Sequence, residues 1–244
     1  MSGEGAAVYR RPPLVEICVD DLAGALAAEA EGADRIELCS AMSEGGLTPS
    51  FGLVQAVLSR VRRVGVRVMI RPRGGNYVFS AEEVEVMLAD IAAIRALPKV
   101  SGVAIGFVCG ALTNAGVIDV RAITRLKAAC GGTPMTFHKA FDMARDLTAA
   151  LDTLLGLGIR SVLTSGGKPT AEAGAETLAA LVEQARGRVS IIAGGSVRAG
   201  NVRALLERTQ VPEVHLRAMR LDPHGRLVTS TEEIAAFIRA VRLG

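Results

Sequence analysis

Short apolar runs alternate along the chain with longer segments rich in alanine and leucine. The short runs are rich in β-branched residues and are predicted to be strands, whereas the longer segments repeat their apolar positions with a helical period. The predicted strands are residues 14–19, 35–40, 67–72, 102–107, 135–140, 161–166, 190–195 and 213–218. The predicted helices are residues 22–32, 50–63, 81–97, 119–129, 146–157, 171–186, 198–208 and 231–241.

The ends of several predicted helices carry residues that favour helix boundaries. Ser50, Ser80 and Ser230 stand where N-caps belong, and Gly32 and Gly158 stand where helices end. Eight strand–helix units in one chain predict an α/β fold, a TIM (β/α)8 barrel. A doubly wound open sheet is the alternative, because a strand count made from pattern alone can err by one.

The chain has 244 residues, of which half are hydrophobic, and this is enough to build one large core. No linker rich in proline or serine interrupts the strand–helix rhythm, so a single domain is predicted over residues 14–244. Residues 1–13 contain no continuous apolar stretch and are expected to form a flexible N-terminal tail.

Charge and composition exclude several classes of partner. The net charge is only +3 and aromatic residues make up 3%, so the basic footprint and stacking residues of a nucleic-acid-binding protein are missing. No apolar run approaches the roughly 18 residues of a membrane helix. Four cysteines without a secretory signal predict reduced thiols and a cytoplasmic location, and their spacing matches no zinc motif.

Several predicted strands have one aliphatic face and one face that carries polar or sulfur-containing side chains. Side chains alternate across a strand, so sequence parity assigns each residue to a face. The aliphatic faces are expected to pack on the helices, and the polar faces are expected to point into the barrel. The polar-face residues are Glu16, Cys18, Glu37, Cys39, Met69, Arg71, Thr136, His138, Glu213, His215 and Arg217.

Carboxylates inside a barrel need partners, because a buried unpaired charge costs several kcal/mol. We expect Glu16 and Glu37 to meet Arg71, His138 or His215 across the interior. One interpretation is a structural network in which these groups neutralise one another. The other is a functional site, which is favoured because the polar residues gather towards the carboxyl ends of the strands, where TIM barrels build their sites.

Glycine-rich loops follow three of the predicted strands. RPRGGNY places Arg71 and Arg73 beside two glycines, while LTSGGK and IIAGGSV place Gly166–Gly167 and Gly194–Gly195 directly after strands. Backbone N–H groups of such loops hold anions, and TIM barrels often bind phosphate after their seventh and eighth strands. These residues are therefore the candidate anion-binding set.

Cys18 and Cys39 occupy matching places on consecutive strands, each two residues after a glutamate. Neighbouring strands lie about 4.8 Å apart, and two thiolates at that spacing suit a soft ion of low coordination number such as Cu(I). The alternative is that both are ordinary buried cysteines. Cys109 and Cys130 lack such neighbours and are expected to be structural, and the methionines form no cluster in the sequence.

The longer motifs resemble those of the CutC copper homeostasis family over residues 14–218. The matching stretches are VEICVDD, GADRIELCSAMSEGGLTPS, MIRPRGGNY, TFHKAFDM, VLTSGG and AGGSVR. The resemblance implies a cytoplasmic TIM barrel that forms a homo-oligomer, a dimer or tetramer, and takes part in copper tolerance. It also implies that copper, as Cu(I), is bound by Cys18 and Cys39. The chain departs from the family after His215, where Leu216 and Arg217 replace small hydroxyl or thiol residues.

The leading hypothesis is a cytoplasmic copper homeostasis protein that binds Cu(I) at the carboxyl end of the barrel. The alternative is an enzyme for a small anionic or phosphorylated substrate. In that enzyme Glu16 or Glu37 would act as the general base and His138 as the acid, while Arg71 and Arg73 would clamp the anion. A scaffold with a vestigial barrel mouth is the third possibility.

Overall fold

A computed structural model describes residues 12–98 and 102–242 of the chain. Eight parallel strands form a closed barrel in sequence order, and β1 pairs with β8 to close it. The strands are β1 Leu14–Val19, β2 Arg35–Leu38, β3 Gly65–Met69, β4 Ile105–Cys109, β5 Met135–Phe137, β6 Ser161–Thr164, β7 Ser190–Ala193 and β8 Glu213–Leu216. The barrel confirms the predicted fold class and excludes the open sheet. The predicted tail, residues 1–13, lies outside the described residues except for Pro12 and Pro13.

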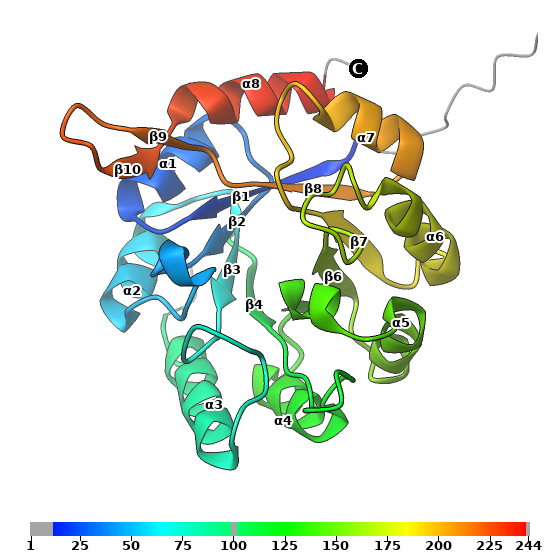
Figure 1. The fold of residues 1–244 in the computed structure, drawn as a ribbon. Helices are drawn as coiled ribbons and strands as arrows, with labels where there is room; N and C mark the ends of the chain where they lie inside the picture. The colour runs from blue at the N-terminus through cyan, green and yellow to red at the C-terminus, as the bar shows by residue number, and fades with distance from the viewer. Residues whose placement is uncertain (1–11, 99–101, 243–244) are drawn as a thin grey trace, which may run out of the picture.

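Helices surround the barrel as an outer ring (Figure 1). They are α1 Leu22–Ala30, α2 Phe51–Arg60, α3 Ala81–Arg95, α4 Val120–Cys130, α5 Leu147–Gly156, α6 Ala175–Ala185, α7 Val202–Thr209 and α8 Thr231–Arg242, with short 3-10 helices η1 Met42–Glu44 and η2 Lys139–Met143. The predicted N-caps are present, because the hydroxyls of Ser50, Ser80 and Ser230 accept hydrogen bonds from backbone N–H groups in the first turns. No helix among the described residues is both long and apolar enough to cross a membrane.

Several parts of the fold differ from the sequence prediction. The strand predicted over residues 135–140 ends at Phe137, and the helix predicted from residue 198 begins at Val202. β4 begins at Ile105 instead of residue 102, because Gly102 has a φ of +88° and belongs to a turn. α6 begins at Ala175 instead of residue 171, and the N–H of Ala171 is used to bind the carbonyl of Gly195 in the neighbouring loop. A hairpin that was not predicted, β9 Met219–Leu221 and β10 Leu227–Thr229, projects beside α1 (Figure 1).

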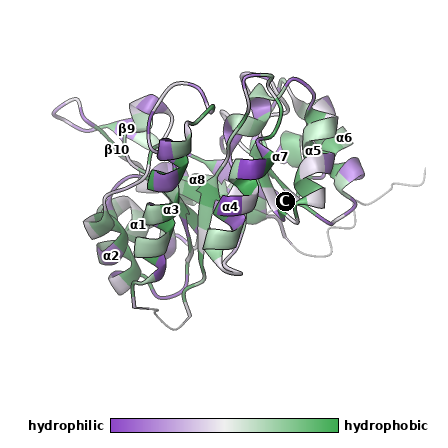
Figure 2. Ribbon diagram, turned by 90° about the horizontal axis from the view of Figure 1, so that it is seen from below, coloured by the Kyte–Doolittle hydropathy of each residue, from purple (hydrophilic) through white to green (hydrophobic). Residues whose placement is uncertain are grey.

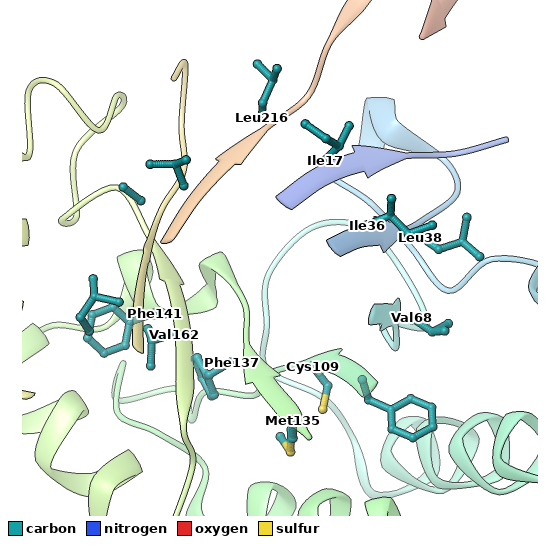
Figure 3. Packing of buried hydrophobic residues seen from close by; sticks show 14 of the residues in the cluster. Ile17, Ile36, Leu38, Val68, Cys109, Met135, Phe137, Phe141, Val162 and Leu216 are labelled. Carbon is teal, nitrogen blue, oxygen red and sulfur yellow. The ribbon is translucent and has the colours of Figure 1, made fainter. Parts of the chain in front are cut away.

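The two faces of the strands are used as their parity predicted. The aliphatic face packs outwards against the helices in one large core, part of which is drawn in Figure 3, with Ile17, Ile36 and Val68. Strongly hydrophobic residues colour much of the central sheet in Figure 2. The inner face holds a separate small cluster of Cys18, Cys39, Met69 and Val108.

A buried ion network fills the barrel interior below this cluster. Arg35 donates from Nε to Glu16 and from NH2 to Glu213, and Ser190 Oγ donates to Glu213 at 2.5 Å. Burial disfavours the charged form of Glu16, but the charge of Arg35 and the bond from His215 outweigh it and lower the pKa of Glu16 to about 2. Glu16 is therefore a permanent carboxylate at neutral pH, and Arg35 is the cation that keeps it so.

We predict that Arg35→Met lowers the free energy of unfolding by about 3–5 kcal/mol, because it leaves a buried carboxylate without its partner. Urea unfolding measures the change. Arg125→Met serves as the control, since Arg125 pairs with the exposed Glu85 and such surface pairs contribute less than about 1 kcal/mol. Equal losses in the two variants would contradict the assignment of Arg35 as the central cation.

Candidate functional site

The carboxyl end of the barrel encloses a cavity of about 230 Å³. One wall is rich in sulfur and comes from the β1–β3 side, with Cys18, Met42 and Met69 beside Glu37. The rest of the lining is rich in nitrogen and includes Arg71, His138, Lys139, Arg198, His215 and Arg217. A larger hollow of about 790 Å³ is lined by residues such as Ile94 and Pro98, and the residues described around it include no group of metal-ligating side chains.

The two thiols predicted to act together lie side by side. Cys18 Sγ and Cys39 Sγ are 4.0 Å apart, both side chains are buried, and Cys39 Sγ is 3.5 Å from Glu37 Oε2. A hydrogen bond from Cys39 and the nearby His215 lower the pKa of Cys18 to about 6, whereas the same partnership raises the pKa of Cys39. The pair therefore carries one thiolate near neutral pH.

The side chains of Glu16, Glu37 and His215 form a cluster close to the two thiols. His215 Nδ1 lies 2.8 Å from Glu16 Oε1, and its Nε2 lies 3.8 Å from Glu37 Oε2. Although burial opposes a charged imidazole, the Glu37 and Glu16 carboxylates and Cys18 raise the pKa of His215 well above its ordinary value. Burial raises the pKa of Glu37 to about 8. Glu37 is thus a proton-carrying group at neutral pH, while Glu16 positions His215.

His138 is a neutral hydrogen-bond donor. Its Nδ1 accepts the N–H of Ala140 at 3.2 Å, so the proton of the neutral ring is on Nε2. Burial and then the charge of Arg71 lower the pKa of His138 to about 3. The buried Nε2 has no hydrogen-bond partner among the described residues, and His138 is one of the residues that line the cavity. Gly110 makes room for the ring, since a Cβ there would lie 2.7 Å from it.

Arg71 is a buried cation without a carboxylate partner in the described residues. Its guanidinium donates to the carbonyls of Glu44, Gly46 and Gly75, and it stacks at 4.7 Å over the ring of Tyr77. The Nε atom is buried and unpartnered in this part of the chain. Carbonyl dipoles orient the group but leave its full positive charge facing the cavity, which favours an anionic ligand.

Arg73 lies apart from Arg71 despite its closeness in sequence. It forms an ion pair with Glu83 at the start of α3 and donates to the carbonyl of Val78 at 2.8 Å. Its guanidinium also lies over the ring of Phe79. Arg73 therefore fastens the loop after β3 to α3 and does not line the cavity.

The predicted anion loop after β6 holds an anion of the chain itself. The carboxylate of Asp142 accepts the N–H of Gly167 at 2.8 Å, the N–H of Ser165 at 3.0 Å and the ammonium of Lys139 at 2.7 Å. The N–H of Gly166 donates to Thr164 Oγ1. These amides are therefore occupied by internal partners.

In the loop after β7, Gly194 continues the sheet and Gly195 lines the cavity. The N–H of Gly194 donates to the carbonyl of Thr164 at 3.0 Å, which continues the sheet pairing. Gly195, with a φ of +110°, borders the cavity together with Ser196 and Arg198. Of the four glycines predicted to bind an anion, Gly195 alone lies in the described cavity wall.

The structure brings most predicted site residues together but changes several pairings. Cys18, Glu37, His138 and Arg71 line one cavity, and Cys39 contacts Cys18 and Glu37 beside it. The partners of Glu16 are Arg35 and His215, and neither Arg71 nor His138 reaches the glutamates. The sequence interpretation passed over Arg35, although it shares the inward parity of Glu37. It also missed Met42, Lys139, Asp142 and Arg198, which follow the strands in short 3-10 helices or loops, where strand alternation gives no signal.

The chain is similar to known proteins along most of its length. The profile of the CutC family matches residues 13–220. A human protein named copper homeostasis protein cutC homolog is 48% identical over 205 residues, which cover 84% of this chain and 73% of that protein. A family protein CutC of Agrobacterium fabrum is 43% identical over 219 residues, covering 88% of this chain and 84% of the relative.

Solved structures agree with the barrel. A crystal structure of CutC from Streptococcus agalactiae superposes with a TM-score of 0.77 at 33% identity, covering 83% of this chain and 97% of that chain. Phosphoribosyl anthranilate isomerase from Thermococcus kodakaraensis gives a TM-score of 0.60 at 15% identity, covering 95% of this chain and 100% of that chain. The second likeness shows the fold alone.

We predict that His138→Gln weakens the pH dependence of stability in mild acid. The folded state keeps His138 neutral down to a pKa of about 3, whereas the unfolded chain protonates it near the ordinary pKa of 6.5. Protons thus bind the unfolded state preferentially between these values, and stability falls with falling pH by up to about 1.4 kcal/mol per unit. Urea unfolding between about pH 4 and pH 6.5 measures the slope in each variant.

His224→Gln is the matched control, because His224 is exposed in the β9–β10 hairpin. Its slope is expected to follow the wild type. A wild-type slope in His138→Gln would show that His138 is not held neutral by burial.

Proposed function

The chain belongs to the CutC family, and from that premise we propose that it binds Cu(I) through Cys18 and Cys39 as a copper homeostasis protein of the cytoplasm. The observation that carries the proposal is the 4.0 Å approach of two buried sulfur atoms, of which that of Cys18 belongs to a residue lining the cavity. The family resemblance also implies a dimer or tetramer. We include this homo-oligomer in the proposal, and analytical ultracentrifugation tests it.

The donor atoms at this position fit copper in its reduced state. Thiolate ligands select Cu(I) over harder metals, and Cu(I) accepts low coordination numbers. The lowered pKa of Cys18 supplies one thiolate before any metal arrives. Burial of both sulfurs keeps water from completing a larger ligand shell, which disfavours ions that need one. In this proposal copper is the cargo of the protein.

We predict that the double variant Cys18→Ser/Cys39→Ser loses Cu(I) affinity by at least about 100-fold, equivalent to about 2.7 kcal/mol. Anaerobic competition against a colorimetric Cu(I) chelator measures it. The control is Cys109→Ala/Cys130→Ala, which removes the same number of buried thiols from the outer core. Unchanged affinity in the Cys18/Cys39 variant, or an equal loss in the control, would contradict the thiol site.

We propose as a second candidate an enzyme for a small anionic substrate. The favouring observation is that two buried donors, His138 Nε2 and Arg71 Nε, have no partner in the described chain and belong to residues of the cavity wall. Copper bound by thiols makes no use of either donor. Buried polar groups in folded proteins nearly always have a hydrogen-bond partner, so these two unpartnered donors mark a place for a ligand.

The cavity suggests a role for each group. Arg71, Arg198 and Arg217 supply the positive charge for the anion. The neutral Nε2–H of His138 is placed to polarise a carbonyl or stabilise a developing oxyanion. Glu37, with a pKa of about 8, exchanges a proton near neutral pH. Glu16 keeps its charge and positions His215, and Arg73, Gly166, Gly167 and Gly194 support the surrounding loops.

We predict that inorganic phosphate or glycerol 3-phosphate stabilises the protein against heat. A ligand at about ten times its Kd adds about 1.4 kcal/mol, which raises the Tm of a chain of this size by about 3–6 °C. The double variant Arg198→Gln/Arg217→Gln is expected to abolish the shift. Sodium chloride at equal ionic strength corrects for screening.

The matched charge control is Arg60→Gln/Arg208→Gln, which removes two exposed arginines near the C-terminal ends of α2 and α7, away from the cavity lining. It is expected to keep the phosphate shift. No shift in the wild type, or the same shift in both double variants, would count against an anion site in the mouth.

A further inference from the structure

A third sulfur atom stands beside the thiol pair. Met42 is the first residue of the short helix η1, which three residues separate from the end of β2. The last of these three, Ala41, is left-handed, with a φ of 45°. This turn folds the methionine back over the barrel mouth. Its Sδ lies 3.9 Å from Cys18 Sγ, nearly the same distance as separates the two thiols. Met42 is half-buried and lines the cavity.

The spacing of the sulfurs suits three ligands better than two. With metal–sulfur bonds of about 2.3 Å, two sulfurs on opposite sides of an ion stand about 4.6 Å apart, whereas three in a plane around it stand about 4.0 Å apart. The separations of 4.0 Å between Cys18 Sγ and Cys39 Sγ and 3.9 Å between Cys18 Sγ and Met42 Sδ match the trigonal value. Cys18 is the corner that both distances share.

Gly46 lies beside the sulfur atoms of Cys39 and Met42 and has no side chain that would crowd them. A Cβ on Gly46 would lie 3.3 Å from Cys39 Sγ and 3.8 Å from Met42 Sδ, so both sulfurs border the position that a side chain at residue 46 would occupy. Gly46 also has a φ of +89°, a conformation that side chains rarely adopt. The loop that contains Met42 therefore places no side chain of residue 46 against the sulfurs of Cys39 and Met42.

A carboxylate oxygen is the alternative third ligand for a metal bound by the two thiols. Glu37 Oε2 lies 3.5 Å from Cys39 Sγ, and Cys18, Glu37 and Cys39 offer ligand atoms within 4.8 Å of one another. A set of two thiolates and a carboxylate suits Zn²⁺, whereas thiolates with a thioether suit Cu(I). The third ligand thus decides which class of metal the thiol pair prefers.

From these contacts we infer that Met42 is the third ligand of the metal, and that its thioether makes the site selective for Cu(I) and its soft analogue Ag(I) over Zn²⁺. This inference rests on the proposed Cu(I) site at Cys18 and Cys39. It adds to that site a ligand from outside the strands and a reason for metal selectivity. Neither follows from the pair of thiols alone.

The test is Met42→Leu, which removes the sulfur and keeps an apolar side chain of similar size. Anaerobic chelator competition is expected to show Cu(I) affinity lower by about tenfold, while Zn²⁺ affinity measured with a fluorescent zinc chelator stays unchanged. X-ray absorption of the Cu(I)-loaded protein is expected to show three sulfur neighbours in the wild type and two in the variant. Thermal unfolding of the metal-free variant checks that it folds.

Met69→Leu is the matched control, because Met69 lies in the same inner cluster as the thiols. It is expected to retain the wild-type Cu(I) affinity and all three sulfur neighbours. Loss of affinity in Met69→Leu with none in Met42→Leu would overturn the assignment of Met42. So would an equal loss of Cu(I) and Zn²⁺ affinity in Met42→Leu, which would remove the basis for selectivity.

The same measurements on Cys18→Ser/Cys39→Ser separate this inference from the proposed function. A loss in the cysteine variant with wild-type behaviour in Met42→Leu overturns the third ligand and leaves the thiol site standing. No loss in the cysteine variant overturns both. Losses in both variants, with fewer sulfur neighbours in each, support the three-sulfur site.

Discussion

The buried ion pair between Arg35 and Glu16 is the interaction on which the barrel mouth depends. It holds Glu16 as a carboxylate in the barrel interior, with a pKa of about 2. That carboxylate orients His215 through a 2.8 Å contact, and the other ring nitrogen of His215 faces Glu37 at 3.8 Å. The positive imidazole in turn favours the thiolate of Cys18. Alternating charges therefore lead from a structural ion pair to the sulfur atoms proposed to bind copper.

Much of this arrangement could be predicted because strand periodicity is a physical constraint. Alternation of side chains assigned Cys18 and Cys39 to the barrel interior, and eight strand–helix units gave the fold. Pairing inside the barrel could not be predicted in the same way, because it depends on the stagger between strands, and so the role of Arg35 was missed. Loop residues were hardest. Met42 reaches the mouth through a left-handed turn at Ala41, which no pattern of apolar residues encodes.

Two kinds of chemistry share one cavity. The sulfur wall, with Cys18 and Met42, offers soft ligands and little charge. The nitrogen-rich lining offers Arg71 without a carboxylate partner in the described residues and a neutral donor on His138. Glu37 lies between them and carries a proton at neutral pH. A copper site explains the first group and an anionic ligand explains the second, so the two proposals concern different atoms of the same mouth and can both hold.

The main proposal is that copper binds at the sulfur atoms of Cys18 and Cys39. Crystals loaded anaerobically with Cu(I) and measured at the copper absorption edge test it most directly, since anomalous scattering locates the metal without reference to any variant. One strong peak is expected about 2.3 Å from the sulfurs of Cys18 and Cys39. A peak elsewhere in the molecule would contradict this proposal. So would the absence of a peak in crystals supplied with one equivalent of Cu(I).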